Sequence, residues 1–276
     1  MTSELDAVRD FGGRVVRVFA AANDADAATV AARLTPVLDA AVERGLRVVV
    51  ALTDFYPTGL FPQGDEGAFS QTPDGFTVLG APFFQGGYRD HYLPWVREVV
   101  SRHAEHPGVL AWELGNEIKC DPDHGAFFAF VDEVGGEIRA RAPRHLITAG
   151  MITARWLSDD EARQLYARPV IDLLTVHDYD AAHAFTDFEV DRAREAGKPL
   201  FVEEAGFQGG DRPARTEADL RHNLDERGLR GYLQWGLMSG GADNGNGDQL
   251  FGMDRVFHGD YDALVGVYRE AADRIR

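Results

Sequence analysis

Residues 109–117 read Val-Leu-Ala-Trp-Glu-Leu-Gly-Asn-Glu, an apolar run of strand length that ends in Asn116 and Glu117. Short apolar runs of this kind recur along the chain, and many are closed by polar or ionisable residues. Continuous apolar runs are typical of parallel strands whose two faces are both buried. The predicted strands are Arg14–Ala20, Arg47–Leu52, Val109–Leu114, His145–Ile152, Asp172–His177, Pro199–Glu203 and Gly231–Leu237.

Helix-like segments separate most of these runs. Strands that alternate with helices predict a parallel sheet with right-handed crossovers. Glycine marks two of the expected helix ends, at Gly45 and Gly197. The predicted helices are Asp24–Arg44, Arg89–Ala104, Ala126–Arg141, Asp159–Ala167, Ala182–Ala196, Arg215–Arg227 and Tyr261–Ile275.

Strand–helix units of this kind fit either a barrel or a doubly wound sheet. No glycine-rich phosphate loop follows the first run, which disfavours a dinucleotide-binding sheet. Polar residues also gather at many strand ends, as they do in barrels. We therefore predict one α/β domain over residues 1–276, a TIM-type (β/α) barrel. Residues 3–11 read as the end of a first helix, so the first barrel strand is expected to be missing or atypical.

Composition excludes some partners. The chain has 276 residues, enough for one large core, and a net charge of −17 from 45 acidic and 28 basic residues. Without a basic stripe, such a chain repels nucleic acid and anionic membranes, whereas a neutral sugar meets no such repulsion. No apolar stretch approaches the roughly 18 residues needed to span a bilayer. Residues 1–13 lack the apolar part of a signal peptide, which indicates a cytoplasmic protein, or a secreted one if the start is truncated.

Two strand ends carry the candidate catalytic carboxyl groups. Glu117 follows one run, and Glu203-Glu204 closes another. Side chains alternate along a strand, so only one of Glu203 and Glu204 is expected to face the barrel mouth squarely. By the same alternation Glu113 points into the barrel, where its charge needs a partner such as Arg17. Two carboxyl groups that face each other are what cleavage of a glycosidic bond requires.

The segment Trp112–Glu117, followed by Glu-Glu-Ala-Gly at 203–206, resembles glycoside hydrolase family 5, the cellulase and β-mannanase family. The resemblance implies a retaining hydrolase that cleaves β-linked neutral sugars by double displacement, with Glu117 as acid/base. The family nucleophile lies in a Glu-x-Gly pattern, which selects Glu204 over Glu203. The expected separation of the two carboxyl groups is roughly 5–5.5 Å, with Glu204 ionised and Glu117 protonated at the start.

Other strand-end residues match the family in order. Arg17 resembles the arginine that hydrogen-bonds the nucleophile. His177 resembles the histidine that lines the sugar site, and Tyr179 the tyrosine that holds the nucleophile. Trp235 resembles the tryptophan that forms a sugar platform. Two more candidates for binding substrate come from the residues themselves, namely Asn116, which could hydrogen-bond a sugar hydroxyl, and Asp54 at the end of the second run.

Several questions stay open at this level. The aromatic residues of the long 55–88 segment could stack on sugar rings or form a small core of their own. A transglycosylase with the same residues, or a carbohydrate-binding barrel without activity, fits the pattern too. His103 and His106, and the acidic loop at 243–248, lack a full ligand set, so we expect no metal and no cofactor. The sugar, the linkage, endo or exo action and the oligomeric state are not determined.

Overall fold

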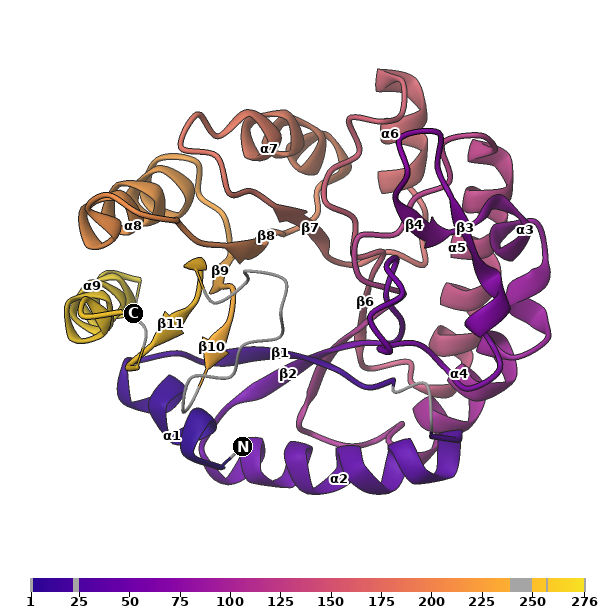
Figure 1. Ribbon diagram of the computed structural model, residues 1–276, viewed down its shortest axis with the longest axis horizontal. Helices are drawn as coiled ribbons and strands as arrows, with labels where there is room; N and C mark the ends of the chain where they lie inside the picture. Colours follow the sequence, from indigo (N-terminus) through magenta and orange to yellow (C-terminus); the bar gives the residue numbers. More distant parts are fainter. Residues whose placement is uncertain (1, 22–24, 239–249, 257, 276) are drawn as a thin grey trace.

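Parallel strands form a curved wall, and helices cover its outer side (Figure 1). The computed structural model describes residues 2–21, 25–238, 250–256 and 258–275. Each predicted strand is present in that part of the chain. The wall consists of β1 (Val15–Phe19), β2 (Arg47–Ala51), β5 (Val109–Glu113), β6 (Leu146–Thr148), β7 (Leu174–His177), β8 (Leu200–Ala205) and β9 (Gly231–Gln234).

The strands form two parallel sheets that continue one another. One sheet has the order β1-β2-β5-β6 and the other β7-β8-β9. The N–H groups of Asp172 and Leu173 donate to Ile147 O over 2.9 and 3.2 Å and so join the two sheets. On the other side, β1 pairs only with β2, and β9 only with β8, within the described residues. The wall is therefore a barrel with an opening between β9 and β1.

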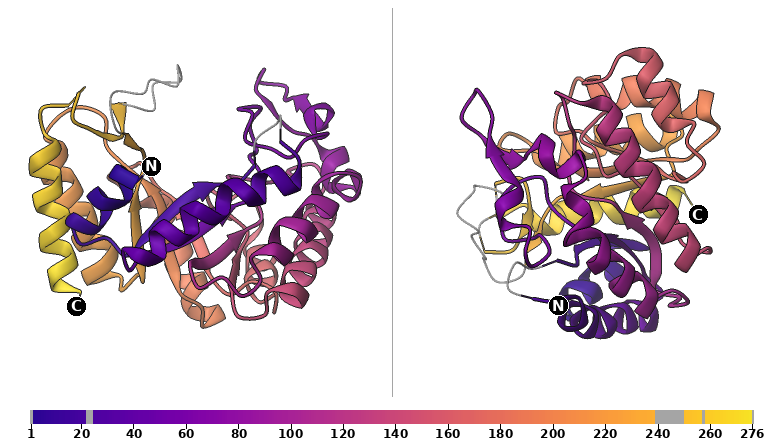
Figure 2. Two further views of the ribbon diagram at one scale, coloured as in Figure 1. Left: turned by 90° about the horizontal axis from the view of Figure 1, so that it is seen from below. Right: turned by 90° about the vertical axis from the view of Figure 1, so that its right-hand side faces the viewer.

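The helices lie outside the strands, as expected for β/α units (Figure 2). Gly45 and Gly197 follow α2 and α7 with φ of 71° and 66°, a left-handed conformation that glycine adopts without strain. The eighth helix starts three residues before its predicted position, because Asp211 caps it by accepting from Ala214 N. The bounds are α1 (Thr2–Asp10), α2 (Ala27–Glu43), α4 (Tyr92–Arg102), α5 (His124–Arg141), α6 (Asp159–Tyr166), α7 (Ala184–Ala196), α8 (Arg212–Leu220), the π-turn η3 (Arg221–Glu226) and α9 (Tyr261–Arg274).

One strand is shorter than predicted. The run His145–Ile152 forms a strand only over β6, because Gly150 takes a φ of 78° and turns the chain out of the sheet. Two further strands, β10 (Leu237–Met238) and β11 (Met253–Asp254), pair with each other beyond the wall. The acidic loop at 243–248 lies outside the described residues.

The long segment after β2 packs most of its buried aromatic rings into the main core of the protein. Five of its aromatic rings are buried, namely Phe55, Phe61, Phe83, Phe84 and Tyr88. Phe83, Phe84 and Tyr88 contact the ring of Phe130 on α5. Phe76, by contrast, is 66% exposed. The segment contains η1 (Glu66–Ala68), β3 (Phe69–Gln71), β4 (Thr77–Leu79), α3 (Ala81–Phe84) and η2 (Gly87–Arg89).

Across the described ranges, every helix is too short or too polar to cross a bilayer.

Candidate active site

Arg17 on β1 is the cation around which the site is built. Its Nε and Nη2 donate to the two carboxylate oxygens of Glu113, each over 2.6 Å, and Nη2 also donates to Asn116 Oδ1 over 2.8 Å. Its Nη1 donates to Glu204 Oε1. The Arg17 side chain is only 5% exposed, and that of Glu113 is fully buried. The predicted partnership between Arg17 and Glu113 is thus present, and the same guanidinium reaches Glu204.

Glu204 at the end of β8 is held from two further sides. The Tyr179 hydroxyl donates to Glu204 Oε2 over 2.8 Å. His177 Nδ1 lies 3.4 Å from the same oxygen. These contacts and Arg17 fix both carboxylate oxygens of Glu204, which is 5% exposed.

Glu117 reaches the site through an unusual backbone conformation. Its φ is 56°, a left-handed value that non-glycine residues seldom adopt, and its N–H donates to Gly150 O over 2.6 Å. The carboxylate lies 2.8 Å from His177 Nδ1, and the nearby Tyr56 hydroxyl contributes to a lowered pKa of Glu117. One carboxylate oxygen of Glu117 and one of Glu204 lie within 4.8 Å of each other.

Both glutamates of the Glu203-Glu204 pair lie near Arg17 and His177, and an irregularity in β8 interrupts the strand alternation between them. Residue Val202 pairs with Val176, but Glu204 pairs with His177, so β8 holds one extra residue at this point. An extra residue interrupts the alternation of side chains. Glu203 therefore comes within 3.9 Å of Arg17 Nε and 3.7 Å of His177 Nε2. Its two oxygens have no hydrogen-bond partner in the described part of the chain.

The four carboxyl groups decide where the protons of the site are held. Burial alone would lower the pKa of His177, but the charge of Glu204, the hydrogen bond to Glu117 and the nearby carboxylate of Glu203 raise it to about 10. Burial raises the pKa of Glu117, but His177 and Tyr56 outweigh it and lower the pKa below its ordinary value. Burial raises the pKa of Glu113 to about 7, in spite of Arg17. In the site without substrate, these shifts favour the proton on His177, and a protonated Glu117 stays a prediction for the site with substrate bound.

Comparison with protein families gives this geometry a context. Residues 2–236 match the family model described as Cellulase (glycosyl hydrolase family 5). The chain belongs to glycosyl hydrolase family 5. The resemblance that the sequence motifs indicated is therefore confirmed, and the family match covers every strand of the wall.

Relatives of this family 5 chain carry names of mannan-degrading enzymes. Mannan endo-1,4-beta-mannosidase A of Podospora anserina is 25% identical over 79% of the chain and 63% of its own length. A probable mannan endo-1,4-beta-mannosidase A-2 of Aspergillus terreus is 25% identical over 67% of the chain. The chain spans 51% of the length of that second relative.

Solved structures confirm the fold. The hyperthermostable endo-1,4-beta-D-mannanase of Thermotoga petrophila RKU-1 superimposes with a TM-score of 0.75 over 99% of the chain and 94% of its own chain, at 17% identity. An exo-beta-1,4-mannosidase from Opitutaceae bacterium strain TAV5 gives a TM-score of 0.72 at 21% identity and covers 99% of the chain and 55% of its own. The predicted TIM-type α/β barrel is thus confirmed for this family 5 chain.

Most of the predicted site residues lie together at the strand ends of the family 5 barrel. Direct contacts link Arg17, Asn116, Glu117, His177, Tyr179, Glu203 and Glu204. Asp54 is buried and accepts from Asn116 Nδ2 over 2.9 Å, so it orients Asn116. Trp235 follows β9 and is half-buried. Its backbone N–H donates to Ala205 O over 2.7 Å. The sugar-platform role of Trp235 remains a prediction.

Sequence reasoning missed two residues of the family 5 site. One is Tyr56 of the long loop, whose hydroxyl lies near Glu117 and has its pKa raised in part by that carboxylate. The signal was its position two residues after Asp54, at the end of β2. Gly150 was overlooked because its contribution is a backbone carbonyl. The described residues also include one group able to hold a metal ion, formed by Glu117, His177 and Glu204. A proton on His177 disfavours metal binding there, because a metal ligand must be the neutral imidazole.

Proposed function

We propose that this protein is a retaining glycoside hydrolase that cleaves β-linked neutral polysaccharides, with β-mannan as the first candidate. Glu204 is the nucleophile and Glu117 is the acid/base. The observation that carries the proposal is the approach of these two carboxylates to within 4.8 Å. Retaining enzymes use a separation of roughly 5–5.5 Å, whereas inverting enzymes need roughly 6.5–9.5 Å to admit a water molecule.

In the first step, Glu204 attacks the anomeric carbon while the bond to the leaving sugar breaks. Arg17 and Tyr179 donate hydrogen bonds to the two oxygens of the attacking carboxylate and so hold it in position. The leaving oxygen takes a proton from Glu117. That proton comes from His177, whose Nδ1 lies 2.8 Å from Glu117 Oε1. The products of this step are a glycosyl–Glu204 ester and a free sugar alcohol.

In the second step, water cleaves the ester. Glu117 accepts a proton from the water as its oxygen attacks the anomeric carbon, and Glu204 leaves as a carboxylate. While Glu204 is esterified it carries no charge, so the attraction that holds the proton on His177 is weaker. Two displacements at the same carbon return its original configuration.

The substrate class follows from charge and from the relatives. The chain carries a net charge of −17, which a neutral polymer tolerates. The proteins named above are two mannan endo-1,4-beta-mannosidases, an endo-1,4-beta-D-mannanase and an exo-beta-1,4-mannosidase. We therefore place β-mannan ahead of β-glucan.

The test is release of reducing sugar from β-mannan, β-glucan and xylan by the wild type and by Glu204→Gln and Glu117→Gln. We expect release from β-mannan, and a fall by about a thousandfold or more in Glu204→Gln. Glu43→Gln is the matched control, because the Glu43 side chain is 75% exposed at the end of helix α2 and takes no part in the site. Proton NMR in the first minutes of the reaction identifies the anomer that is released, before mutarotation mixes the two anomers.

The outcomes separate the alternatives. The β-anomer as first product supports retention, and the α-anomer contradicts it. New longer oligosaccharides in place of reducing ends would make the protein a transglycosylase. Binding of mannan without turnover by the folded wild type would make it a carbohydrate-binding barrel.

A further inference from the structure

His183 is a strained residue outside the proposed catalytic group. Within the described ranges, the non-glycine residues with a left-handed backbone are Glu117 and His183, with φ values of 56° and 55°. This conformation costs energy in a residue that carries a side chain, and it persists where the surroundings fix it, often at functional sites. Because Glu117 is the proposed acid/base, His183 is the strained residue that still needs a role.

His183 ends the loop that carries Tyr179. The loop, residues 178–183, connects β7 to α7. At its start, the N–H of Asp178 donates to Glu204 O over 3.0 Å. Tyr179 follows, and its hydroxyl donates to Glu204 Oε2. The direction of this hydroxyl therefore depends on how firmly the far end of the loop is held at His183.

The imidazole of His183 contacts side chains of α8 and η3. Its Nδ1 lies 2.9 Å from Asp219 Oδ1, and its ring stacks on His222 with centroids 3.9 Å apart and planes 10° from parallel. His222 Nε2 lies 3.2 Å from Asp187 Oδ1, one turn further along α7. His222 belongs to the π-turn, in which its C=O accepts from Arg227 N over 2.9 Å. Such turns inside helices are frequent at functional sites.

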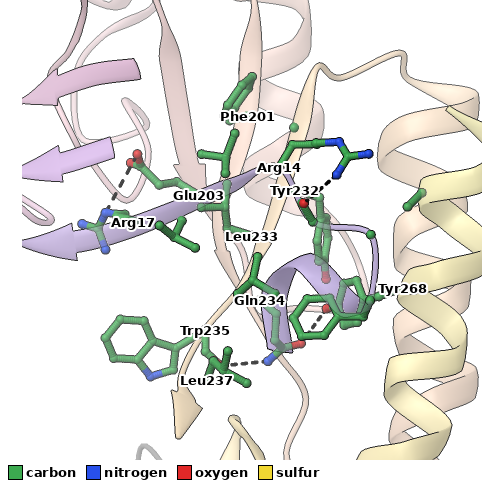
Figure 3. Close-up of a pocket in the computed structure, with 18 of the residues that line it drawn as sticks. Arg14, Arg17, Phe201, Glu203, Tyr232, Leu233, Gln234, Trp235, Leu237 and Tyr268 are labelled. Atoms are coloured by element: carbon green, nitrogen blue, oxygen red, sulfur yellow. Dashed lines mark hydrogen bonds and ion pairs between the residues drawn. The ribbon is translucent and has the colours of Figure 1, made fainter. Parts of the chain in front are cut away.

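Asp219 is itself held from the side of the barrel. Its side chain is only 4% exposed. Asn223 Nδ2 donates to Asp219 Oδ1 over 3.0 Å, and the Tyr232 hydroxyl, from β9, donates to Oδ2 over 2.5 Å. Figure 3 shows Tyr232 beside Tyr268 of α9, and their ring centroids are 6.3 Å apart. The carboxylate opposite His183 is thus fixed to a barrel strand.

We propose that His183 is a positioning residue of the active site. Asp219 and His222 hold its imidazole, and His183 in turn holds the end of the loop that aims Tyr179. The inference rests on the proposed function, because the aim of the Tyr179 hydroxyl matters for turnover only if Glu204 is the nucleophile. A glycine at this position would remove the strain together with both side-chain contacts.

Two substitutions separate the backbone of His183 from its side chain. Asparagine tolerates left-handed φ values, and its Nδ2 can take the place of the imidazole Nδ1 opposite Asp219. Glycine takes the same conformation and reaches neither contact. On β-mannan we expect His183→Gly to lower kcat about tenfold with KM within about twofold, and His183→Asn to stay within about threefold of the wild type. Equal kcat values for His183→Gly and the wild type would overturn the proposal.

A double-mutant cycle with Tyr179→Phe tests whether His183 acts through Tyr179. Phenylalanine lacks the hydroxyl, so His183→Gly in this background should change kcat by less than about twofold. A further tenfold loss in the double variant would refute the positioning role. His106→Asn is the matched control, because its imidazole is equally exposed, at 17%, and lies 3.1 Å from Asp39. His106 precedes β5 and so lies at the end of the barrel opposite the site.

Amide hydrogen exchange reports on the loop independently of activity. We expect residues 178–183 to exchange at least about tenfold faster in His183→Gly than in the wild type, while α2 exchanges equally in both. His106→Asn should leave exchange in the loop unchanged. Inactivity of the wild type on mannan would count against the proposed function, whereas equal loop exchange in the wild type and His183→Gly would show that His183 does not hold the loop.

Discussion

Arg17 donates two hydrogen bonds of 2.6 Å to Glu113, and the same guanidinium donates to Glu204. The planar guanidinium thus places one edge on a buried structural carboxylate and another N–H on the proposed nucleophile. Because Glu113 orients Arg17, the position of Glu204 depends on a residue from which no contact with substrate is expected.

Replacing Arg17 by methionine removes the cation shared by Glu113, Glu203 and Glu204. Uncompensated buried charge typically costs about 3–5 kcal/mol of unfolding free energy. We expect a loss of that size at pH 7, and a smaller one near pH 5, where protonation of Glu113 replaces the missing cation. Urea unfolding at both pH values measures it. Arg14→Met, at an exposed position just before β1, is the control; an equal loss there would show a general strand effect.

Glu113→Gln tests positioning. Glutamine cannot hold the guanidinium by two charged contacts, so Arg17 and Glu204 lose their alignment. We expect kcat on mannan to fall about tenfold, while KM changes less than twofold. Glu98→Gln serves as the matched variant, because Glu98 pairs on the surface with Arg102. A change in KM alone would assign Glu113 to substrate binding instead.

The raised pKa of His177 predicts that the folded protein loses stability at alkaline pH. Its pKa in the folded chain is raised to about 10, above the ordinary 6.5. A raised pKa means that the protonated form is favoured by folding, so this stabilisation is complete below about pH 6.5 and disappears as pH rises through 10. His177→Gln should lose less unfolding free energy than the wild type between pH 6.5 and 9.5. Parallel pH curves for the two proteins would contradict the assignment.

Gly150→Ala should damage both the fold and the site. An added Cβ would meet Gly115 O and the Glu113 carboxylate, and the φ of 78° strains any other residue. We expect a loss of about 3 kcal/mol in unfolding free energy, together with reduced activity, because the carbonyl that holds Glu117 N moves. Gly45→Ala is the matched control. Its φ of 71° is similar but its Cβ meets nothing within 4 Å, so about 1 kcal/mol is expected.

Much of the architecture was accessible from the pattern of residues. Buried parallel strands need apolar runs, and the runs located all the wall strands. The partnership of Arg17 with Glu113 followed from alternation and from the cost of an unpaired charge. The family motifs selected Arg17 and Tyr179, and both side chains donate hydrogen bonds to Glu204 in the structure.

Other features depend on three-dimensional context. The irregularity that turns both Glu203 and Glu204 to the same cations arises from the registers of β7 and β9 against β8, which no local pattern encodes. Tyr56 lies on a long segment whose aromatic rings pack against the main core. The proton on His177 reflects the sum of three carboxylates that are distant in sequence.

The position of β1 at the rim of the barrel opening has a consequence for inactivation. Arg17, on which the alignment of Glu204 depends, belongs to a strand with a ladder on one side only in the described chain. Fraying of this strand costs less than opening of the buried strands β2 or β7. Mild denaturant should therefore abolish activity before the circular dichroism of the helices changes, and amide hydrogens of β1 should exchange ahead of those of β2. The catalytic apparatus would then melt as a local unit within a barrel that is still folded.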